Sequence, residues 1–230
     1  MMLVDYNVTN GLLLKRNKKM NLTIITAAWH SENLPKVIKS IDNQTYQDFQ
    51  HIIINDNNTD VRATFKGLCD GVRRHWIDFG VRTHYYGALA RNTGIIIAFS
   101  YIHHSKRDID NEWVVFHDDD NLWEPYHLES MIKALEANTE ATMVASDAIW
   151  VGANDKTFRK VHKCKLKHGG CDLGQFMYKT SLFKKYGYFE PSPIHKHRYD
   201  WELVKKMTDG EGDKLVYTNK PTFLMNYKKK

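Results

Sequence analysis

Cysteine is scarce in this sequence, because its 230 residues include only three: Cys69, Cys164 and Cys171. Three cysteines cannot build a disulfide framework, and this low usage favours a reducing compartment, so we expect a cytoplasmic protein. His162 and His168 lie close in sequence to the last two cysteines, and these four side chains are conceivable zinc ligands. Their spacing matches no familiar zinc-binding pattern, which argues against a metal site there.

The sequence also has no apolar run long enough to span a bilayer and no signal-peptide pattern. These absences predict a protein that is soluble or peripheral to a membrane. Internal repeats and low-complexity segments are absent too, and a hydrophobic content of 42% is enough for a folded core. The length suits one domain, which we place at residues 21–230 after an N-terminal extension of residues 1–20.

The formal net charge is +6, but lysine and arginine are spread along most of the chain. Dense basic clusters occur only at residues 15–19 and 228–230. Such clusters are most often solvated tails. They also suit contact with an anionic membrane or with a polyanion such as nucleic acid.

Apolar runs and helical periodicities alternate through the first 120 residues or so. This alternation predicts an α/β fold with a mostly parallel sheet, flanked by helices, and a less regular C-terminal region. The expected strands are residues 22–28, 51–55, 81–86, 113–117, 141–151, 175–179, 215–218 and 222–227. The expected helices are residues 33–43, 88–103, 181–186 and 199–207, with a further helix of mixed character ending near residue 76.

Three polar clusters follow expected strands, at residues 28–32, 55–58 and 118–120. The last is Asp118-Asp119-Asp120, directly after the apolar run that ends at His117. Ligands of open α/β sheets bind beyond the carboxyl ends of the strands. Three adjacent carboxylates repel one another, and a hard divalent cation would offset that repulsion. The alternative is a structural role, with the acidic residues capping a helix that has Pro125 in its first turn.

Six motifs in order resemble those of family 2 glycosyltransferases with the GT-A fold. The resemblance covers residues 21–227, and it places a nucleotide-sugar-binding half at residues 21–121 and an acceptor and catalytic half at residues 122–230. It departs at Asn55, Asn121 and Tyr199, where the family more often has acidic residues. The matching segments are Thr23–His30, Leu34–Tyr46, Ile52–Asp60, Gly87–Gly94, Asp118–Asp120 and Tyr199–Leu203.

The resemblance implies a divalent cation, Mn²⁺ or Mg²⁺, at the position of the family's D-x-D motif. Asp120 would be the main metal carboxylate, and Asp118 would contact the metal, its water shell or the ribose. His197 is the expected histidine ligand, with His195 as its neighbouring alternative, because a neutral imidazole can bind a metal. The segment around these histidines, residues 190–197, is otherwise a solvated loop or a lid over the diphosphate.

The same resemblance implies where the donor binds, and a UDP-sugar is the donor we expect. Ala27 and Trp29 end the first nucleotide-binding strand, and Asp119 lies within the acidic motif. Asp56 resembles the acid that accepts a hydrogen bond from the nucleotide base, although an aspartate also stabilises a turn. Arg91 would reach the acidic cluster or the diphosphate, or form a structural ion pair.

Asp200 is the expected general base, which would take a proton from an acceptor hydroxyl on a glycan or another acceptor. One base without a covalent nucleophile implies a single displacement with inversion. An acid at a helix start is also favoured by the helix dipole alone. Two other functions compete: a sugar nucleotidyltransferase, and an inactive module that binds glycan or nucleic acid. The first usually has a Gly-rich loop after the first strand, which residues 29–33 lack.

Overall fold

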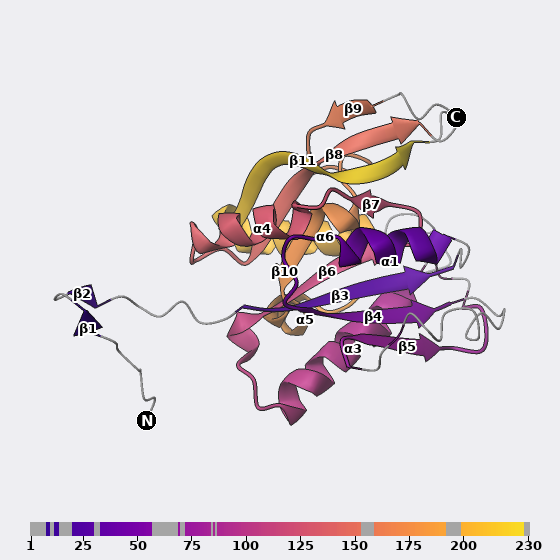
Figure 1. Cartoon of the computed structure of the whole chain (residues 1–230), viewed down its shortest axis with the longest axis horizontal. Coiled ribbons are helices and arrows are strands. Elements are labelled where there is room, and N and C mark those ends of the chain that lie inside the picture. The colour runs from indigo at the N-terminus through magenta and orange to yellow at the C-terminus, as the bar shows by residue number, and fades with distance from the viewer. Residues whose placement is uncertain are drawn as a thin grey trace.

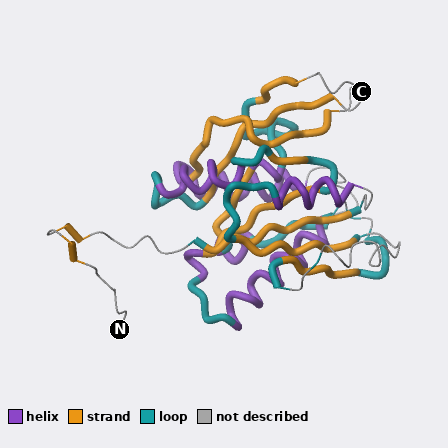
Figure 2. Tube along the Cα trace, viewed as in Figure 1, coloured by secondary structure: helices purple, strands orange, loops and turns teal. Residues whose placement is uncertain are grey.

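A computed structural model gives the structure of the chain. It describes residues 8–9, 12–13, 20–29, 33–56, 69, 72–83, 85, 87–152, 159–191 and 199–227. The basic clusters at residues 15–19 and 228–230 and both candidate histidines, His195 and His197, lie outside these residues. Within the described ranges, no helix is both long and apolar enough to cross a membrane. The fold is mixed α/β, with helices packed on a curled sheet (Figure 1; Figure 2).

Four parallel strands form one half of the large sheet, in the order β5, β4, β3, β6 (Figure 1). These strands are β3 (Asn21–Ala28), β4 (Phe49–Asn55), β5 (Arg74–Asp78) and β6 (Glu112–Asp118). Most residues of β3, β4 and β6 are buried, on both faces of the sheet. A nearly continuous apolar run is typical of parallel strands that are buried on both faces. The strand pairings confirm the predicted parallel arrangement for this half.

Helices α1 and α3 cover opposite faces of this half. Ile24 of β3 packs in one hydrophobic cluster with Ile41 of α1, whereas the next residue, Ile25, packs with Ile95 of α3. Successive side chains of a strand point to opposite faces, which explains the division. The main helices are α1 (Leu34–Asp42), α3 (Ala88–His104), α4 (His127–Glu136), α5 (Ser181–Tyr186) and α6 (Tyr199–Glu211).

The other half of the sheet is of mixed direction. β10 pairs antiparallel with both β6 and β8, and β11 lies between β8 and β7, parallel to the first and antiparallel to the second. α4 packs against β8 and β11. The remaining elements are β1 (Val8–Thr9) and β2 (Leu12–Leu13), which form a separate small sheet, β7 (Leu122–Trp123), β8 (Met143–Gly152), β9 (Arg159–His162), β10 (Phe176–Lys179), β11 (Leu215–Tyr227), and the 3₁₀ turns η3 (Ile109–Asn111), η4 (Leu173–Gln175) and η5 (Gly212–Lys214).

Four predictions of local structure were wrong. The expected helix does not continue to residue 76, because the strand β5 occupies Arg74–Asp78. The strand that follows β4 in the parallel sheet is β5, not residues 81–86. The charged Arg74 hides this strand in the sequence pattern. In the fold, buried Arg74 is neutralised by its ion pair with Asp42, and it donates to His51 Nδ1 at 3.1 Å. Residues 122–125 open no helix, since β7 occupies Leu122–Trp123 and α4 begins at His127. The two expected closing strands are one strand, β11, with register shifts between Tyr217 and Phe223.

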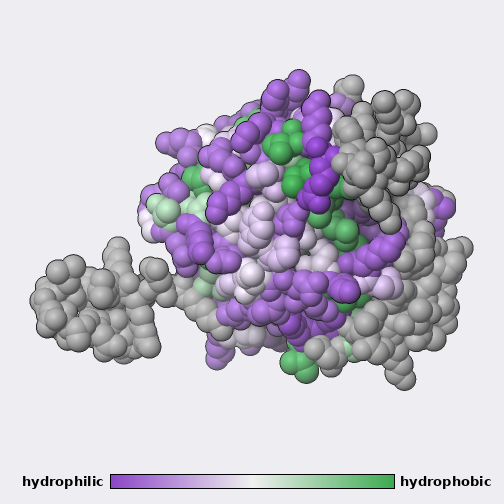
Figure 3. Space-filling model, turned by 45° about the horizontal axis from the view of Figure 1, so that its top comes forward, coloured by the Kyte–Doolittle hydropathy of each residue, from purple (hydrophilic) through white to green (hydrophobic). Residues whose placement is uncertain are grey.

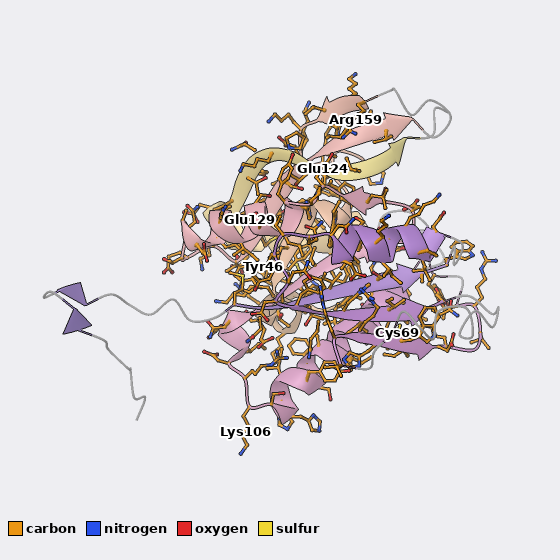
Figure 4. All side chains as sticks on the ribbon, viewed as in Figure 1. Tyr46, Cys69, Lys106, Glu124, Glu129 and Arg159 are labelled. Atoms are coloured by element: carbon orange, nitrogen blue, oxygen red, sulfur yellow. The ribbon has the colours of Figure 1, made fainter. Side chains whose placement is uncertain are left out.

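The outer edge of the mixed half is polar. In Figure 4, Arg159 of β9 lies close to Glu124, and the Nη2 to Oε1 distance of this ion pair is 2.7 Å. The face seen in Figure 3 is mainly hydrophilic over the described residues, with small hydrophobic patches between the charged side chains. A surface of this kind is ordinary for a folded domain and by itself indicates no function.

His127 is a buried histidine whose neutrality stabilises the fold. It stacks on Trp123 and shares a 2.7 Å hydrogen bond with Thr222 Oγ1. Burial, together with the nearby His117, lowers the pKa of His127 from 6.5 to about 3. Below pH 6.5 the unfolded chain therefore takes up a proton that the folded chain excludes, and the stability falls with pH until about pH 3.

We expect this one histidine to remove about 2 kcal/mol of unfolding free energy between pH 7 and pH 5. In His127→Gln, urea unfolding at the two pH values should therefore give a difference smaller by about that amount than in the unmodified protein. His103→Gln, at an exposed position of α3, is the matched control. An unchanged difference in His127→Gln would show that His127 does not stay neutral when folded.

Candidate active site

The carboxyl ends of β3, β4 and β6 meet at one edge of the sheet. The strand register sets Ala28 beside Asn55, and Ala27 beside Asp118. A cavity of about 170 Å³ opens at this edge. It brings together seven residues that the sequence analysis singled out, along with Ala28 and Gly87: its lining is Ala27, Ala28, Trp29, Asp56, Gly87, Arg91, Asp118, Asp119 and Asp120.

Arg91 joins this cavity to the expected base. It lies in the first turn of α3 and is 5% exposed. Its Nη2 donates to Asp118 Oδ1 at 2.5 Å, and its Nη1 lies 3.4 Å from Asp200 Oδ1. Burial alone would lower the pKa of Arg91, but the carboxylates of Asp118 and Asp200 outweigh it and hold the pKa well above its ordinary value. Arg91 is therefore a permanent cation between two acids from distant parts of the chain.

Gly87 makes the approach of Arg91 possible. It precedes α3 with a φ of +81°, a backbone conformation that glycine adopts without strain. A Cβ atom at this position would lie 3.1 Å from the Cβ of Ala27 and 3.3 Å from Nη1 of Arg91. A larger residue would therefore push the first turn of α3 away from the end of β3.

Asp119 and Asp120 differ although they are neighbours. Asp119 is 6% exposed and accepts a hydrogen bond from the backbone N–H of Trp29. The Trp29 ring in turn carries the guanidinium of Arg82, 3.9 Å from its centroid. Asp120 is exposed at the cavity. Asp119 therefore fixes the loop after β6 against the end of β3, while Asp120 faces the solvent side.

Asp56 is held by a residue that the sequence analysis missed. Its Oδ1 accepts from the backbone N–H of Thr83, and its Oδ2 accepts from Thr83 Oγ1, both at 2.9 Å. Before it, Asn55 donates to Asp78 Oδ1 at 2.5 Å. These contacts fix the orientation of the Asp56 carboxylate at the cavity wall. A threonine in a short polar segment carries no sequence signal of such a role.

Asp200 lies in the first turn of α6 and contacts Arg91, which lines the cavity. Its side chain is 42% exposed, and Asp118 is 24% exposed. Partial removal from water raises the pKa of Asp200 to about 6; Arg91 opposes this rise and Asp118 adds to it. The carboxyl group is thus mostly ionised at neutral pH but titrates closer to neutrality than an ordinary aspartate.

Asp172 is a further acid whose charge interacts with these acids, and it was not predicted. Removal from water and the charge of Asp118 raise its pKa to about 7; the N–H of Gly174 lowers the pKa, and the charges of Asp200 and Asp120 raise it further. The sequence analysis singled out His168 and Cys171 near it as conceivable zinc ligands, but not Asp172 itself. A single aspartate in an irregular stretch has no motif to distinguish it.

The metal prediction rests on Asp118 and Asp120. Among the described residues, no three or more His, Cys, Asp or Glu side chains are grouped so that they could hold a metal ion. The conceivable zinc ligands between His162 and Cys171 are all described and form no such group. Two carboxylates at one cavity do suit Mg²⁺ or Mn²⁺, because these ions are commonly held by one or two carboxylates and the phosphates of the substrate.

The model of one family matches most of this chain, and solved structures of low sequence identity share its fold. The sequence model of glycosyl transferase family 2 matches residues 23–190. Residues 1–349 of TarS from S. aureus in complex with UDP have a similar structure, with a TM-score of 0.68 and 15% identity, over 90% of this chain and 61% of that one. Mannosyltransferase PcManGT from Pyrobaculum calidifontis in complex with GDP-Man and Mn²⁺ gives a TM-score of 0.65 and 13% identity, over 93% and 59%.

A third structure, residues 1–349 of TarS in complex with UDP-GlcNAc, gives a TM-score of 0.66 at 13% identity, over 92% of this chain and 60% of that one. The chain thus spans about 60% of the length of these similar proteins. At such identities the likeness is one of fold. A search of curated proteins finds no significant match.

Proposed function

Because the chain belongs to glycosyl transferase family 2, we propose that it moves a sugar from a nucleoside-diphosphate sugar to an acceptor hydroxyl. The observation that carries this proposal is the Arg91 bridge, which joins Asp118, the acid of the cavity at the end of β6, to Asp200, the acid in the first turn of α6. A leaving diphosphate and an attacking hydroxyl need two such groups on either side of the sugar. Sequence and geometry thus point to the same chemistry.

The donor that we propose is a UDP-sugar. Among the similar structures, TarS is bound to UDP and UDP-GlcNAc, and PcManGT to GDP-Man. In this chain Asp56, fixed by Thr83, would accept a hydrogen bond from the nucleotide base. Ala27 and Trp29 would form the wall beside the nucleoside, and Asp119 keeps Trp29 in place through its backbone N–H.

Asp118 and Asp120 would hold the divalent cation, Mn²⁺ or Mg²⁺, together with the diphosphate. When bound, such an ion stabilises the negative charge that develops on the leaving diphosphate. Arg91 holds the Asp118 carboxylate in place, and its guanidinium adds positive charge at the same end of the cavity. His197 as a further ligand remains a proposal from sequence, outside the described residues.

Asp200 would act as the general base of a single, inverting displacement. The acceptor oxygen forms a bond to the anomeric carbon as the bond from that carbon to the phosphate oxygen breaks. The hydroxyl proton passes to Asp200, and the bonding electron pair leaves with the diphosphate. The contact with Arg91 holds the carboxylate in place for this transfer. We propose a glycan hydroxyl as acceptor, reached by a cytoplasmic enzyme that contacts an anionic membrane surface peripherally.

A donor hydrolysis and transfer screen tests this function. UDP-, GDP- and dTDP-sugars are each incubated with the purified chain and Mn²⁺, Mg²⁺ or EDTA, and the released nucleoside diphosphate is measured. We expect release from a UDP-sugar with either metal and none with EDTA. Release that persists in EDTA would contradict the metal role, and inertness toward every donor, with no nucleotide binding by calorimetry, would contradict the function.

A further inference from the structure

Cys164 and Cys171 stand opposite each other at the base of a tight loop that follows β9. The loop closes through its backbone, because the N–H of Lys165 donates to the carbonyl of Gly170 at 3.0 Å and the N–H of Gly170 donates to the carbonyl of Lys167 at 2.8 Å. In antiparallel chains, the residues next to such a bonded pair face each other with their Cα atoms about 4.5 Å apart. Cys164 and Cys171 hold these positions, and that separation lies within the range of about 4.4–6.8 Å that disulfides require.

The side chains of these two cysteines are in contact. The thiol of Cys164 donates a hydrogen bond to Cys171 Sγ, and both half-buried side chains pack against the same hydrophobic cluster. Cys69, the third cysteine, packs against a different cluster, which contains Leu34 and Ile53. The fold therefore brings two of the three thiols together and keeps the third apart.

Contacts of the loop backbone keep the two cysteines in register. The backbone N–H of Cys164 donates to Asp147 Oδ1 at 3.0 Å, which ties this side of the loop to β8. Gly169 has a φ of +70°, a conformation that glycine adopts without strain. A Cβ atom at Gly170 would lie 2.6 Å from the carbonyl oxygen of Lys165. The two glycines thus allow the loop to close tightly enough for the thiols to meet.

The two thiols differ in their readiness to lose a proton. The hydrogen bond from the Cys164 thiol lowers the pKa of Cys171, and the backbone N–H of Lys167 adds to this effect, while burial and the charge of Asp172 oppose it. The same thiol–thiol hydrogen bond, together with burial, raises the pKa of Cys164. Because the thiolate is the form that attacks a disulfide, Cys171 is the thiol that reacts first.

We propose that Cys164 and Cys171 form a modification site, which a low-molecular-weight disulfide such as glutathione disulfide converts reversibly into an intramolecular disulfide. The Cys171 thiolate attacks one sulfur of the reagent, whose S–S bond breaks and releases a first thiolate. The Cys164 thiol then attacks the Cys171 sulfur and releases the second thiolate. The protein gives up two hydrogen atoms, and the reagent takes them up as two thiols. This site does not depend on the proposed glycosyl transfer, and it suits a reducing compartment, where such disulfides are transient.

Equilibration of the full chain with glutathione tests this site. The protein is held in a buffer of reduced glutathione and glutathione disulfide, its free thiols are blocked with N-ethylmaleimide, and it is digested with trypsin without a reductant. Trypsin cuts after Lys165 and Lys167, so Cys164 and Cys171 fall on separate peptides that only a disulfide keeps joined. We expect these two peptides to be recovered joined, and a reductant to separate them. The ratio of joined to open pair should be at least about tenfold higher in the folded chain than in concentrated urea, because the fold holds the thiols together.

Three serine variants identify the role of each thiol. Cys164→Ser should stop at a mixed disulfide between glutathione and Cys171, whereas Cys171→Ser should leave Cys164 mostly unmodified. Cys69→Ser is the matched control and should give the joined peptides as the unmodified chain does. Equal modification of the first two variants would remove Cys171 as the attacking thiol. A joined pair that includes Cys69, or a ratio no higher in the folded chain than in urea, would overturn the proposal, and the second of these measurements needs no variant to fold.

Discussion

Replacing Asp200 with asparagine is expected to remove sugar transfer and to leave donor binding intact. Asparagine has the shape of aspartate but takes up no proton, so the acceptor hydroxyl loses its base. The transfer rate should fall by about 10²–10⁴-fold, which is the usual contribution of a general base. Calorimetry with UDP and Mn²⁺ should give an unchanged affinity, because the cavity that we propose for the nucleotide does not include Asp200.

The pH profile of the unmodified enzyme gives an independent reading of the same residue. The base acts only when it is deprotonated, and the pKa of Asp200 is raised to about 6. The transfer rate should therefore be flat above about pH 7 and fall about tenfold for each pH unit well below pH 6. Asp209→Asn, at an exposed acid on the same helix, is the matched control and should keep both rate and profile. Full activity in Asp200→Asn would remove Asp200 from the mechanism.

Replacing Asp120 with alanine is expected to abolish metal-dependent nucleotide binding. Asp120 is exposed at the cavity, so its loss should not unfold the protein. It also removes one like charge from the cluster, and the melting temperature should stay the same or rise. Titration of UDP in the presence of Mn²⁺ should show an affinity loss of about 100-fold or more, to the level measured in EDTA.

Asp213→Ala, at an exposed acid of η5, controls for the general effect of removing a negative charge. It should bind UDP with Mn²⁺ as the unmodified chain does. If Asp120→Ala keeps the metal-dependent affinity, another group holds the cation, and the D-x-D assignment is wrong. The two variants thus separate the roles within the site. Asp120→Ala is expected to lose nucleotide binding, and Asp200→Asn is expected to lose sugar transfer.

The parallel half was readable from sequence because its strands are apolar on both faces and end abruptly in polar residues. Ile52–Ile54 followed by Asn55-Asp56, and Val114–Phe116 followed by His117 and three aspartates, carry fold and site in the same few residues. β5 was missed because its pattern holds Arg74, whose burial depends on Asp42, a partner from α1. Sequence periodicity does not register a charge that a distant residue neutralises.

The residues missed in the site share a different cause. Thr83 lies within residues 81–86, which were predicted as a strand, and Asp172 lies in an irregular segment. Each interacts with an acid that is distant in the chain. Arg91 was found because a family motif surrounds it, yet its bridge to Asp118 and Asp200 was not foreseeable without coordinates. Local patterns in the sequence predicted which residues could act at a site, whereas tertiary packing determines which of them come into contact.

The place of β11 between β8 and β7 has a consequence for biosynthesis. Asp200 contacts Arg91 although it lies 109 residues later in the chain. β11, the strand that follows α6, completes the sheet by lying between β8 and β7. The ribosome thus synthesises the parallel half and the acidic loop well before Asp200, the proposed base. Partly made chains are therefore expected to be catalytically silent, and their assembly to be slow, because the decisive pairings join distant segments.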